Sequence, residues 1–221
     1  MLDREFGYST YASAKANFII SKKVEAYNPC RDDNISILIS QLLGDGSFDE
    51  VRRSIRIVHG IKQWDYLKFK VGLINKAYPQ SYPLSNIRKL THTQGHKYVS
   101  WYSGNFGEST FRKITSMTDE ELVSNLTPLG WCLWFLDDGN LNYCESSGKH
   151  MYRLSIAISN EKLRKAAIHE LNSVGFTPNE SHCELYFSDR VQVAKFINTF
   201  VRPFDNIIPT CMKYKYYMSI S

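Results

Sequence analysis

A segment near residue 40 combines helical spacing of apolar residues with an abrupt polar end. The sequence ISILISQLLGDG, residues 35–46, is predicted to be a helix that is capped by Asp33 or Asn34 and stops at Gly46. Asp45 falls at the C-terminal end of this helix, where the helix dipole disfavours an acid by about 0.3–1 kcal/mol. An acid held in this position calls for a nearby positive charge or for solvent.

A second segment repeats the pattern. The sequence LTPLGWCLWFLDDG, residues 126–139, is predicted to be a helix with Thr127 as its N-cap and Pro128 at its first position. It ends in two acids, of which Asp138 is the one that directly precedes Gly139. Two acids at matching ends of two apolar helices are harder to attribute to chance than one.

Each helix is followed by a segment in which apolar and polar residues alternate, as in a half-buried strand. In VRRSIRIVH, residues 51–59, the isoleucines share one face, whereas Arg52 and Arg56 share the other. In KHMYRLSIAIS, residues 149–159, a lysine and an arginine lie opposite the apolar face. An ordinary antiparallel sheet with one solvated face explains the alternation, but the basic residues on both outer faces suggest a polyanionic partner.

Further amphipathic helices are predicted at residues 62–78 and 160–176, so the order of helix, strands, helix, strands and helix occurs twice. The two acids lie 138 − 45 = 93 residues apart, which is too long for a solenoid repeat. The predicted fold class is α+β with two similar halves. We expect an N-terminal extension (residues 1–33), a first half (34–118) and a second half (119–221).

The composition narrows the setting without defining a function. The 221 residues are 43% hydrophobic and carry a formal charge of +5, which permits a polyanionic partner but does not require one. The five cysteines form no CxxC pair, so a disulfide framework or thiolate zinc site is not expected. The sequence shows no secretory signal and no apolar run of about 20 residues. We therefore expect an intracellular, reducing compartment, such as a bacterial or organellar interior, and no membrane partner.

The two acids suggest a metal site if the two helices pack together. Ser36, Ser40 and Gly44 form a stripe of small residues that would let another helix approach. Asp45 and Asp138 would then lie side by side, and carboxylates with free helix-end carbonyls are ligands that hard cations prefer. Paired acids, a divalent cation and a basic surface together suggest phosphodiester hydrolysis, with Mg²⁺ or Mn²⁺ as the cofactor and Ca²⁺ as a cation that binds without supporting cleavage.

The same segments resemble the signature helices of the LAGLIDADG homing endonucleases, in the single-chain class with two motifs. LLGDGSF (42–48) and LGWCLWFLDDGNL (129–141) carry the resemblance, with the first motif at residues 38–46 and the second at residues 131–139. VHGIKQWDYL (58–67) and IIPTCMKYK (207–215) resemble two further segments of the family. The resemblance implies two αββαββα halves in one chain, with the motif helices at their interface and two sheets forming a saddle over DNA.

The resemblance also implies roles for individual residues. Asp45 and Asp138 match the metal-binding acids, while Gly44 and Asp137 match positions whose backbone carbonyls complete the coordination. On this interpretation the Asp137 side chain is not a metal ligand and faces solvent or the interface. Lys215 matches a lysine near the scissile phosphate. For its first-half counterpart we predict Lys113, with Arg112 as the alternative.

The predicted DNA contacts are basic or aromatic residues of the strands and turns: Arg52, Arg53, Arg56, Arg88, Lys97, Lys149, Arg153 and Tyr186. His59 precedes a helix start and is either close to the active-site water or an ordinary strand-end histidine. His92 and His96 are four residues apart, but Gly95 and the β context argue against a zinc pair.

The function predicted from these features is site-specific double-strand DNA cleavage by a monomer that recognises a long, nearly asymmetric target. Two alternatives remain at this point. One is an RNA maturase that binds its host intron RNA on the same scaffold, and the other is a non-catalytic, sequence-specific DNA-binding protein. Retention of both acids and of Lys215 favours the nuclease, since RNA binding alone does not need them.

Overall fold

The structure, a computed structural model, describes residues 27, 29–79, 87–91, 95–104, 106–146 and 149–217. The first half consists of α2 (Arg31–Leu43), β1 (Gly46–Asp49), β2 (Ser54–Gly60), α3 (Trp64–Ala77), β3 (Arg88–Thr91), β4 (Lys97–Tyr102) and α4 (Glu108–Thr115). The second consists of α6 (Pro128–Asp138), β5 (Gly139–Ser146), β6 (Lys149–Ala157), α7 (Glu161–Ser173), β7 (Asn179–Ser181), β8 (Glu184–Phe187) and α8 (Arg190–Phe196). The predicted pair of αββαββα halves is confirmed. Helix α5 (Asp119–Ser124) links them, and the predicted N-terminal extension lies mostly outside the described residues.

The two sheets have the same strand order. The first is arranged β1-β2-β4-β3 and the second β5-β6-β8-β7, and all pairs are antiparallel. The registers also correspond, because Gly46 lies opposite Ile57 in the first sheet and Gly139 lies opposite Ile156 in the second. This correspondence allows residues of one half to be compared with their equivalents in the other.

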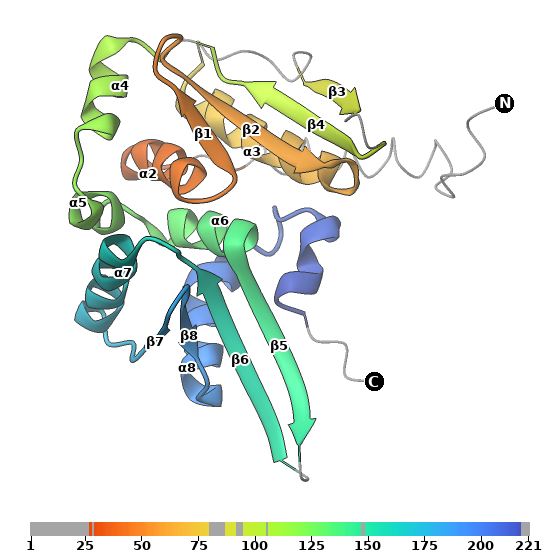
Figure 1. Cartoon of the computed structure of the whole chain (residues 1–221), viewed down its shortest axis with the longest axis vertical. Coiled ribbons are helices and arrows are strands. Elements are labelled where there is room, and N and C mark those ends of the chain that lie inside the picture. Colours follow the sequence, from red (N-terminus) through yellow and green to blue (C-terminus); the bar gives the residue numbers. More distant parts are fainter. Residues whose placement is uncertain are drawn as a thin grey trace, which may run out of the picture.

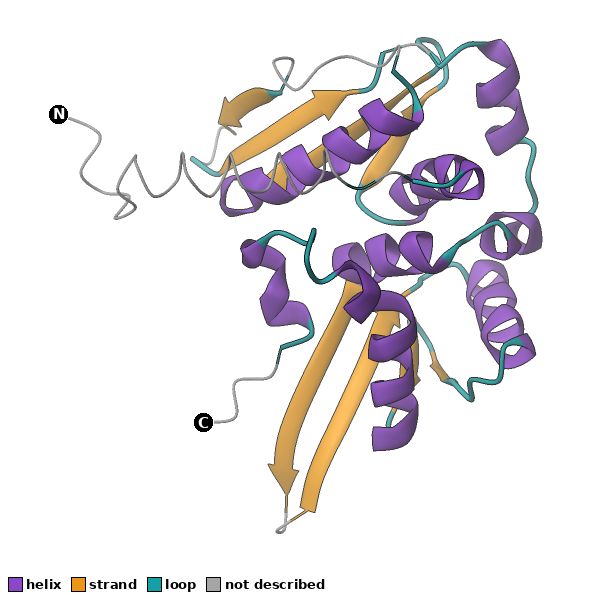
Figure 2. Cartoon of the chain, turned by 180° about the vertical axis from the view of Figure 1, so that it is seen from behind, coloured by secondary structure: helices purple, strands orange, loops and turns teal. Residues whose placement is uncertain are grey.

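Among the described residues, helices cover only one face of each sheet. Ile55, Ile57, Val99 and Trp101, which alternate along β2 and β4, are fully buried. Figure 1 shows both sheets from the side that the helices leave bare, and Figure 2 shows the helices packed behind them. The bare faces of the two sheets therefore open on the same side of the molecule.

The two helix starts follow different capping rules. In α6, Thr127 accepts a hydrogen bond from the Gly130 amide and Pro128 is the first helical residue, as predicted. Helix α2 begins earlier than predicted, because Asp33 acts from inside the first turn: its carboxylate accepts from the Cys30 amide at 3.0 Å. The same carboxylate accepts from the Thr127 hydroxyl at 2.6 Å, which joins the two helix starts.

Helices α2 and α6 pack against each other at the centre of the molecule. Ser36 and Ser40 are fully buried in this seam. A Cβ atom on Gly130 would collide with the Ser36 hydroxyl, and one on Gly44 would collide with the Asp137 carboxylate. The predicted stripe of small residues therefore does let the helices approach closely. Within the described residues, no helix has the length and apolar character needed to cross a membrane.

Candidate active site

Close packing of α2 and α6 brings their acidic C-terminal ends together. The Asp45 amide donates a hydrogen bond to Asp137 Oδ2 at 3.2 Å, across the boundary between the halves. The Asp45 side chain is 38% exposed, whereas that of Asp137 is fully buried. Asp45 and Asp137 thus have different surroundings, and of the two alternatives for the Asp137 side chain, solvent or interface, the structure places it at the interface.

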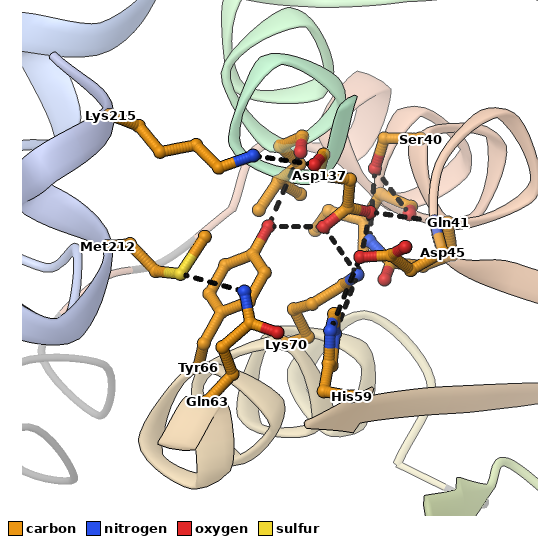
Figure 3. Close-up of polar contacts among 12 residues, drawn as sticks. Ser40, Gln41, Asp45, His59, Gln63, Tyr66, Lys70, Asp137, Met212 and Lys215 are labelled. Carbon is orange, nitrogen blue, oxygen red and sulfur yellow. Dashed lines mark hydrogen bonds and ion pairs between the residues drawn. The ribbon is translucent and has the colours of Figure 1, made fainter. Parts of the chain in front are cut away.

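Asp137 is held by a ring of donors from the first half (Figure 3). Lys70 Nζ donates to both carboxylate oxygens, at 2.9 and 2.7 Å, and the Tyr66 hydroxyl donates to Oδ1 at 2.7 Å. Burial, with the neighbouring Asp137 charge, raises the pKa of Tyr66 well above its usual value, so the phenol keeps the proton that it donates. With the Asp45 amide included, the Asp137 carboxylate accepts hydrogen bonds at both oxygens and has little capacity left for a metal.

Lys70 also sets the protonation of His59. The lysine is fully buried, and its Nζ lies 3.3 Å from His59 Nε2. An ammonium group can only donate, so Nε2 must accept and the imidazole proton must sit on Nδ1. Burial and the Lys70 charge lower the pKa of His59 to about 3, which keeps the ring neutral at pH 7.

His59 Nδ1 lies 3.3 Å from Asp45 Oδ2. A chain of polar contacts therefore runs from Asp137 through Lys70 and His59 to the partly exposed Asp45. The His59 side chain is only 1% exposed. The interpretation of His59 as a surface strand-end residue is therefore wrong.

Lys215 approaches the same region from the C-terminal 3₁₀ helix η5 (Thr210–Lys215). Its Nζ donates to the backbone carbonyls of Asp137 at 2.7 Å and Gly139 at 3.0 Å. Burial lowers its pKa, although Asp137, Asp45 and Asp138 oppose that shift. Lys215 thus lies at the end of α6, within the electrostatic influence of all three acids.

Asp138 has different neighbours from Asp137. It lines a pocket of about 330 Å³ together with Leu43, Ile158 and Leu163. Burial, followed by the charges of Asp137 and Asp45, raises the pKa of Asp138 to about 7. The acid therefore lies within the electrostatic influence of Asp45, and a hydrogen bond with the Trp134 side chain, which lines the same pocket, opposes the rise of its pKa.

The residues present fit a divalent cation. Burial and the Asp137 charge raise the pKa of Asp45 as well as that of Asp138, and three carboxylates here face the two ammonium groups of Lys70 and Lys215. Asp45, His59 and Asp137 each place a ligand atom within 4.8 Å of the others, but Asp137 is already saturated. Asp45 and Asp138 are the carboxylates left to bind a cation, and an oxygen donor set suits Mg²⁺ or Mn²⁺.

The predicted first-half lysine does not lie at this site. Lys113 lines a pocket with Arg31 and Asp32 at the opposite end of α2, and a helix of 13 residues is roughly 20 Å long. Arg112 is exposed and paired with Glu108. The expectation for both residues is corrected. The ammonium group that the first half places beside the acids is that of Lys70. In the sequence, the only sign of this was a lysine among the apolar residues of α3.

The bare sheet faces carry several of the predicted DNA contacts. Arg56 lies opposite Tyr102 on the first sheet, with its guanidinium 5.7 Å from the ring centroid. On the second sheet the guanidinium of Arg153 lies 3.7 Å from the centroid of Tyr186 and is paired with Glu184. These arginines are held in position by neighbours on the sheet surface.

The other predicted DNA contacts have more varied places. Arg52 and Arg53 are in the turn between β1 and β2, and Arg88 lies opposite Ser100 on the bare face. Lys149 is at the far end of the β5–β6 hairpin. Lys97 lies on the same face of β4 as the buried Val99 and Trp101, so its position lies off the bare face and does not support the predicted contact. His96 is described, whereas His92 lies outside the described residues.

Comparison with known families identifies the chain. Residues 35–172 match the model of the LAGLIDADG DNA endonuclease family. The chain belongs to this family. The match spans both motif helices and both bare-faced hairpins, so the LAGLIDADG assignment covers the whole of the acidic site on α2 and α6.

Solved structures with the same fold are distant in sequence. Full-length DUF199/WhiA from Thermatoga maritima aligns with a TM-score of 0.54 and 17% identity, over 92% of this chain and 68% of that one. The LAGLIDADG homing endonuclease I-GzeII, in complex with its DNA target, aligns with a TM-score of 0.50 and 11% identity, over 82% and 86% of the two chains. At this identity the likeness establishes the fold alone.

The chain also matches a segment of larger proteins. Protein RecA of Mycolicibacterium chitae is 28% identical over 141 residues, and that of Mycolicibacterium flavescens is 28% identical over 137 residues. The alignments cover 58% and 56% of this chain but only 31% and 30% of the RecA proteins. The chain thus spans less than a third of these relatives.

The Lys70–Asp137 pair predicts a large loss of stability when one partner is removed. Lys70→Met should lower the free energy of unfolding by about 3–5 kcal/mol, because the Asp137 charge would remain buried without its counter-ion. Urea denaturation measures the change. The exposed Lys62 in the preceding turn provides the control Lys62→Met, and a Lys70→Met protein as stable as this control would contradict the assignment.

The raised pKa of Asp138 predicts a pH-dependent difference from Asp138→Asn in EDTA. Because the folded pKa of about 7 lies above the ordinary value of 3.8, the stability linked to this carboxyl is complete below pH 3.8 and is lost as the pH rises through 7. The wild type should therefore lose stability relative to Asp138→Asn between about pH 4 and pH 7. Parallel stability curves for the two proteins would show that the Asp138 carboxyl titrates normally.

Proposed function

We propose that this chain is a site-specific double-strand DNA endonuclease of the intron- or intein-type homing class, acting as a monomer with Mg²⁺. The observation that supports this best is the partly exposed Asp45 carboxylate, which the buried Asp137–Lys70–His59 chain holds at the end of the helix seam. Family membership and the basic residues on both bare faces agree with DNA as the substrate.

Asp45 and Asp138 would hold the cation, together with the helix-end carbonyls of Gly44 and Asp137. When bound, the cation would activate a water molecule and stabilise the charge on the phosphate. Lys215, which already lies among the three acids, would bind a non-bridging phosphate oxygen. His59, whose Nδ1 lies 3.3 Å from Asp45 Oδ2, would limit the positions open to that carboxylate.

The DNA would lie across the two bare sheet faces, with strands in the major groove. Arg56, Arg88 and Arg153 would contact base edges or phosphates there, with Tyr186 packed beneath Arg153. Arg52 and Arg53 in the β1–β2 turn, and Lys149 at the far end of the second hairpin, would contact the flanking backbone. A footprint that spans two sheets implies a long target whose two halves differ.

The target can be found with a plasmid library that carries a randomised insert. Incubation with Mg²⁺, capture of the broken ends and sequencing should return one long, asymmetric site. Recovery of no cut site, accompanied by tight binding to the transcript of the intron that encodes the chain, would instead favour the RNA maturase. Specific DNA binding without breakage would favour a regulator.

Replacing Asp45 should separate cleavage from binding. Asp45→Asn is expected to abolish cleavage of both strands in Mg²⁺, because a neutral amide cannot hold the cation in place. Affinity for the target, measured in Ca²⁺ by fluorescence anisotropy, should stay within about threefold of wild type, since phosphate contacts dominate affinity.

The matched control is Asp32→Asn, which removes a carboxylate from the exposed start of the same helix. It should cut at the wild-type rate. If Asp45→Asn also cuts both strands at that rate, the assignment of Asp45 to the metal site is wrong.

Replacing Arg153 should weaken binding to the target. Arg153→Gln is expected to reduce target affinity by about 10- to 100-fold, equivalent to the 1–3 kcal/mol of one good base contact. Affinity for unrelated DNA should fall much less. The exposed Lys162 on α7 offers the control Lys162→Gln. Equal losses on target and unrelated DNA would reduce Arg153 to a phosphate contact.

A further inference from the structure

A carboxylate lies on the bare face of the second sheet, where negative charge disfavours the approach of DNA. Glu184 and Tyr186 alternate along β8 with the buried Leu185 and Phe187, so both project from the face that the helices leave bare. The Glu184 side chain is 30% exposed. Because a carboxylate repels phosphates, an acid in this place calls for a role that offsets the repulsion.

The fold itself does not require an acid at this position. The strand registers make Tyr102 of the first sheet equivalent to Tyr186 of the second. Two residues before each tyrosine, the first sheet carries Ser100 and the second carries Glu184. The same strand arrangement therefore forms with an uncharged residue at this position, and the acid is a property of the second half.

Glu184 forms an ion pair that fixes the direction of Arg153. Arg153 Nη2 donates to Glu184 Oε1, and the Ser181 hydroxyl donates to the same oxygen at 3.3 Å. The Arg153 Cζ atom lies 3.7 Å from the centroid of the Tyr186 ring. Although burial acts in the opposite direction, hydrogen bonds from Arg153 and two serines lower the pKa of Glu184, so the acid is ionised at pH 7. The pair thus presents guanidinium donors beside a carboxylate acceptor, and both side chains are partly exposed.

The major-groove edge of a G·C pair has the complementary order of groups. Guanine presents the N7 and O6 acceptors, and cytosine presents its N4 amino group beside them. Guanidinium donors suit guanine, whereas an ionised carboxylate only accepts and therefore suits the cytosine amino group. Adenine also has an amino group, but its N7 acceptor would face the carboxylate. Thymine presents an acceptor and a methyl group, neither of which a carboxylate can bind.

We infer that Arg153 and Glu184 together read one G·C pair of the target, with Arg153 on guanine and Glu184 on cytosine. This inference rests on the proposed binding of DNA across the bare faces and is independent of cleavage. Glu184 lies on β8, two strands away from Gly139 at the end of α6. Since neighbouring strands lie about 4.8 Å apart, the two residues are separated by roughly 10 Å. The pair should therefore lie in the inner part of the half-site that the second sheet covers, close to the cut.

Selection of bound duplexes from a randomised pool in Ca²⁺ identifies the pair from binding alone. Wild type should prefer G·C at one inner position by at least about tenfold over the other three pairs. Glu184→Ala should lower that preference by about fivefold or more and leave the other positions unchanged. The matched control Glu161→Ala removes an exposed acid that pairs with Lys165 on α7, and it should select the wild-type sequence. Melting temperatures of all three proteins are measured alongside.

Modified bases separate the two contacts on the selected duplex. N4-methylcytosine replaces the amino hydrogen that faces the major groove with a methyl group. It should weaken wild-type binding by about tenfold and Glu184→Ala binding by less than about twofold. 7-Deazaguanine, which lacks the N7 acceptor, should weaken both proteins, because Arg153 is unchanged in them.

Three outcomes decide between this inference and its alternatives. Wild-type binding that tolerates N4-methylcytosine would overturn the contact with cytosine. A Glu184→Ala protein that binds all DNA more tightly but selects the same sequence would also overturn it, because Glu184 would then act only by repelling phosphates. A wild type that selects the G·C pair in Ca²⁺ but cuts no DNA in Mg²⁺ would contradict the proposed endonuclease and support the inference.

Discussion

The buried ion pair between Lys70 and Asp137 is the interaction on which the rest of the site depends. It crosses from α3 of the first half to α6 of the second, and both side chains are fully buried. Such a pair contributes little net stability, because desolvation offsets much of the attraction. In this registration of the two halves, the Asp137 carboxylate accepts hydrogen bonds from the lysine, the tyrosine and the Asp45 amide at once.

This arrangement of the two halves requires small side chains where α2 and α6 are in contact. Ser36, Ser40, Gly44 and Gly130 let the backbones approach, and the Asp33–Thr127 contact fixes the opposite end. The helices are therefore tied at both ends by polar contacts and joined between them by apolar packing. The polar groups at the acidic end come mostly from the first half. The site is therefore asymmetric, although the two halves are related by near twofold symmetry.

Local sequence signals predicted most of the helices and strands and much of the fold. Periodicity and the Thr127–Pro128 cap placed α6, and the motif acids were found from the glycines that follow them. The short strand β1 and the linker helix α5 were missed, because four to six residues carry too little periodicity. Lys70 was missed for a different reason: its partner lies 67 residues away, so only the tertiary structure reveals why a lysine is buried there. Lys113 was chosen by its position in the chain, which did not reflect distance in space.

The acidic end of the seam has unfavourable electrostatics in the absence of a ligand. Asp45 and Asp138 both have raised pKa values, since the two lysines do not balance three carboxylates in a partly buried space. A cation bound only by the folded chain would remove that imbalance and stabilise the fold by mass action. The features that make this end unfavourable for the free protein are therefore the features that make it suited to hold a metal ion beside a phosphate. Stability is supplied by the apolar seam, which leaves its acidic end available for chemistry.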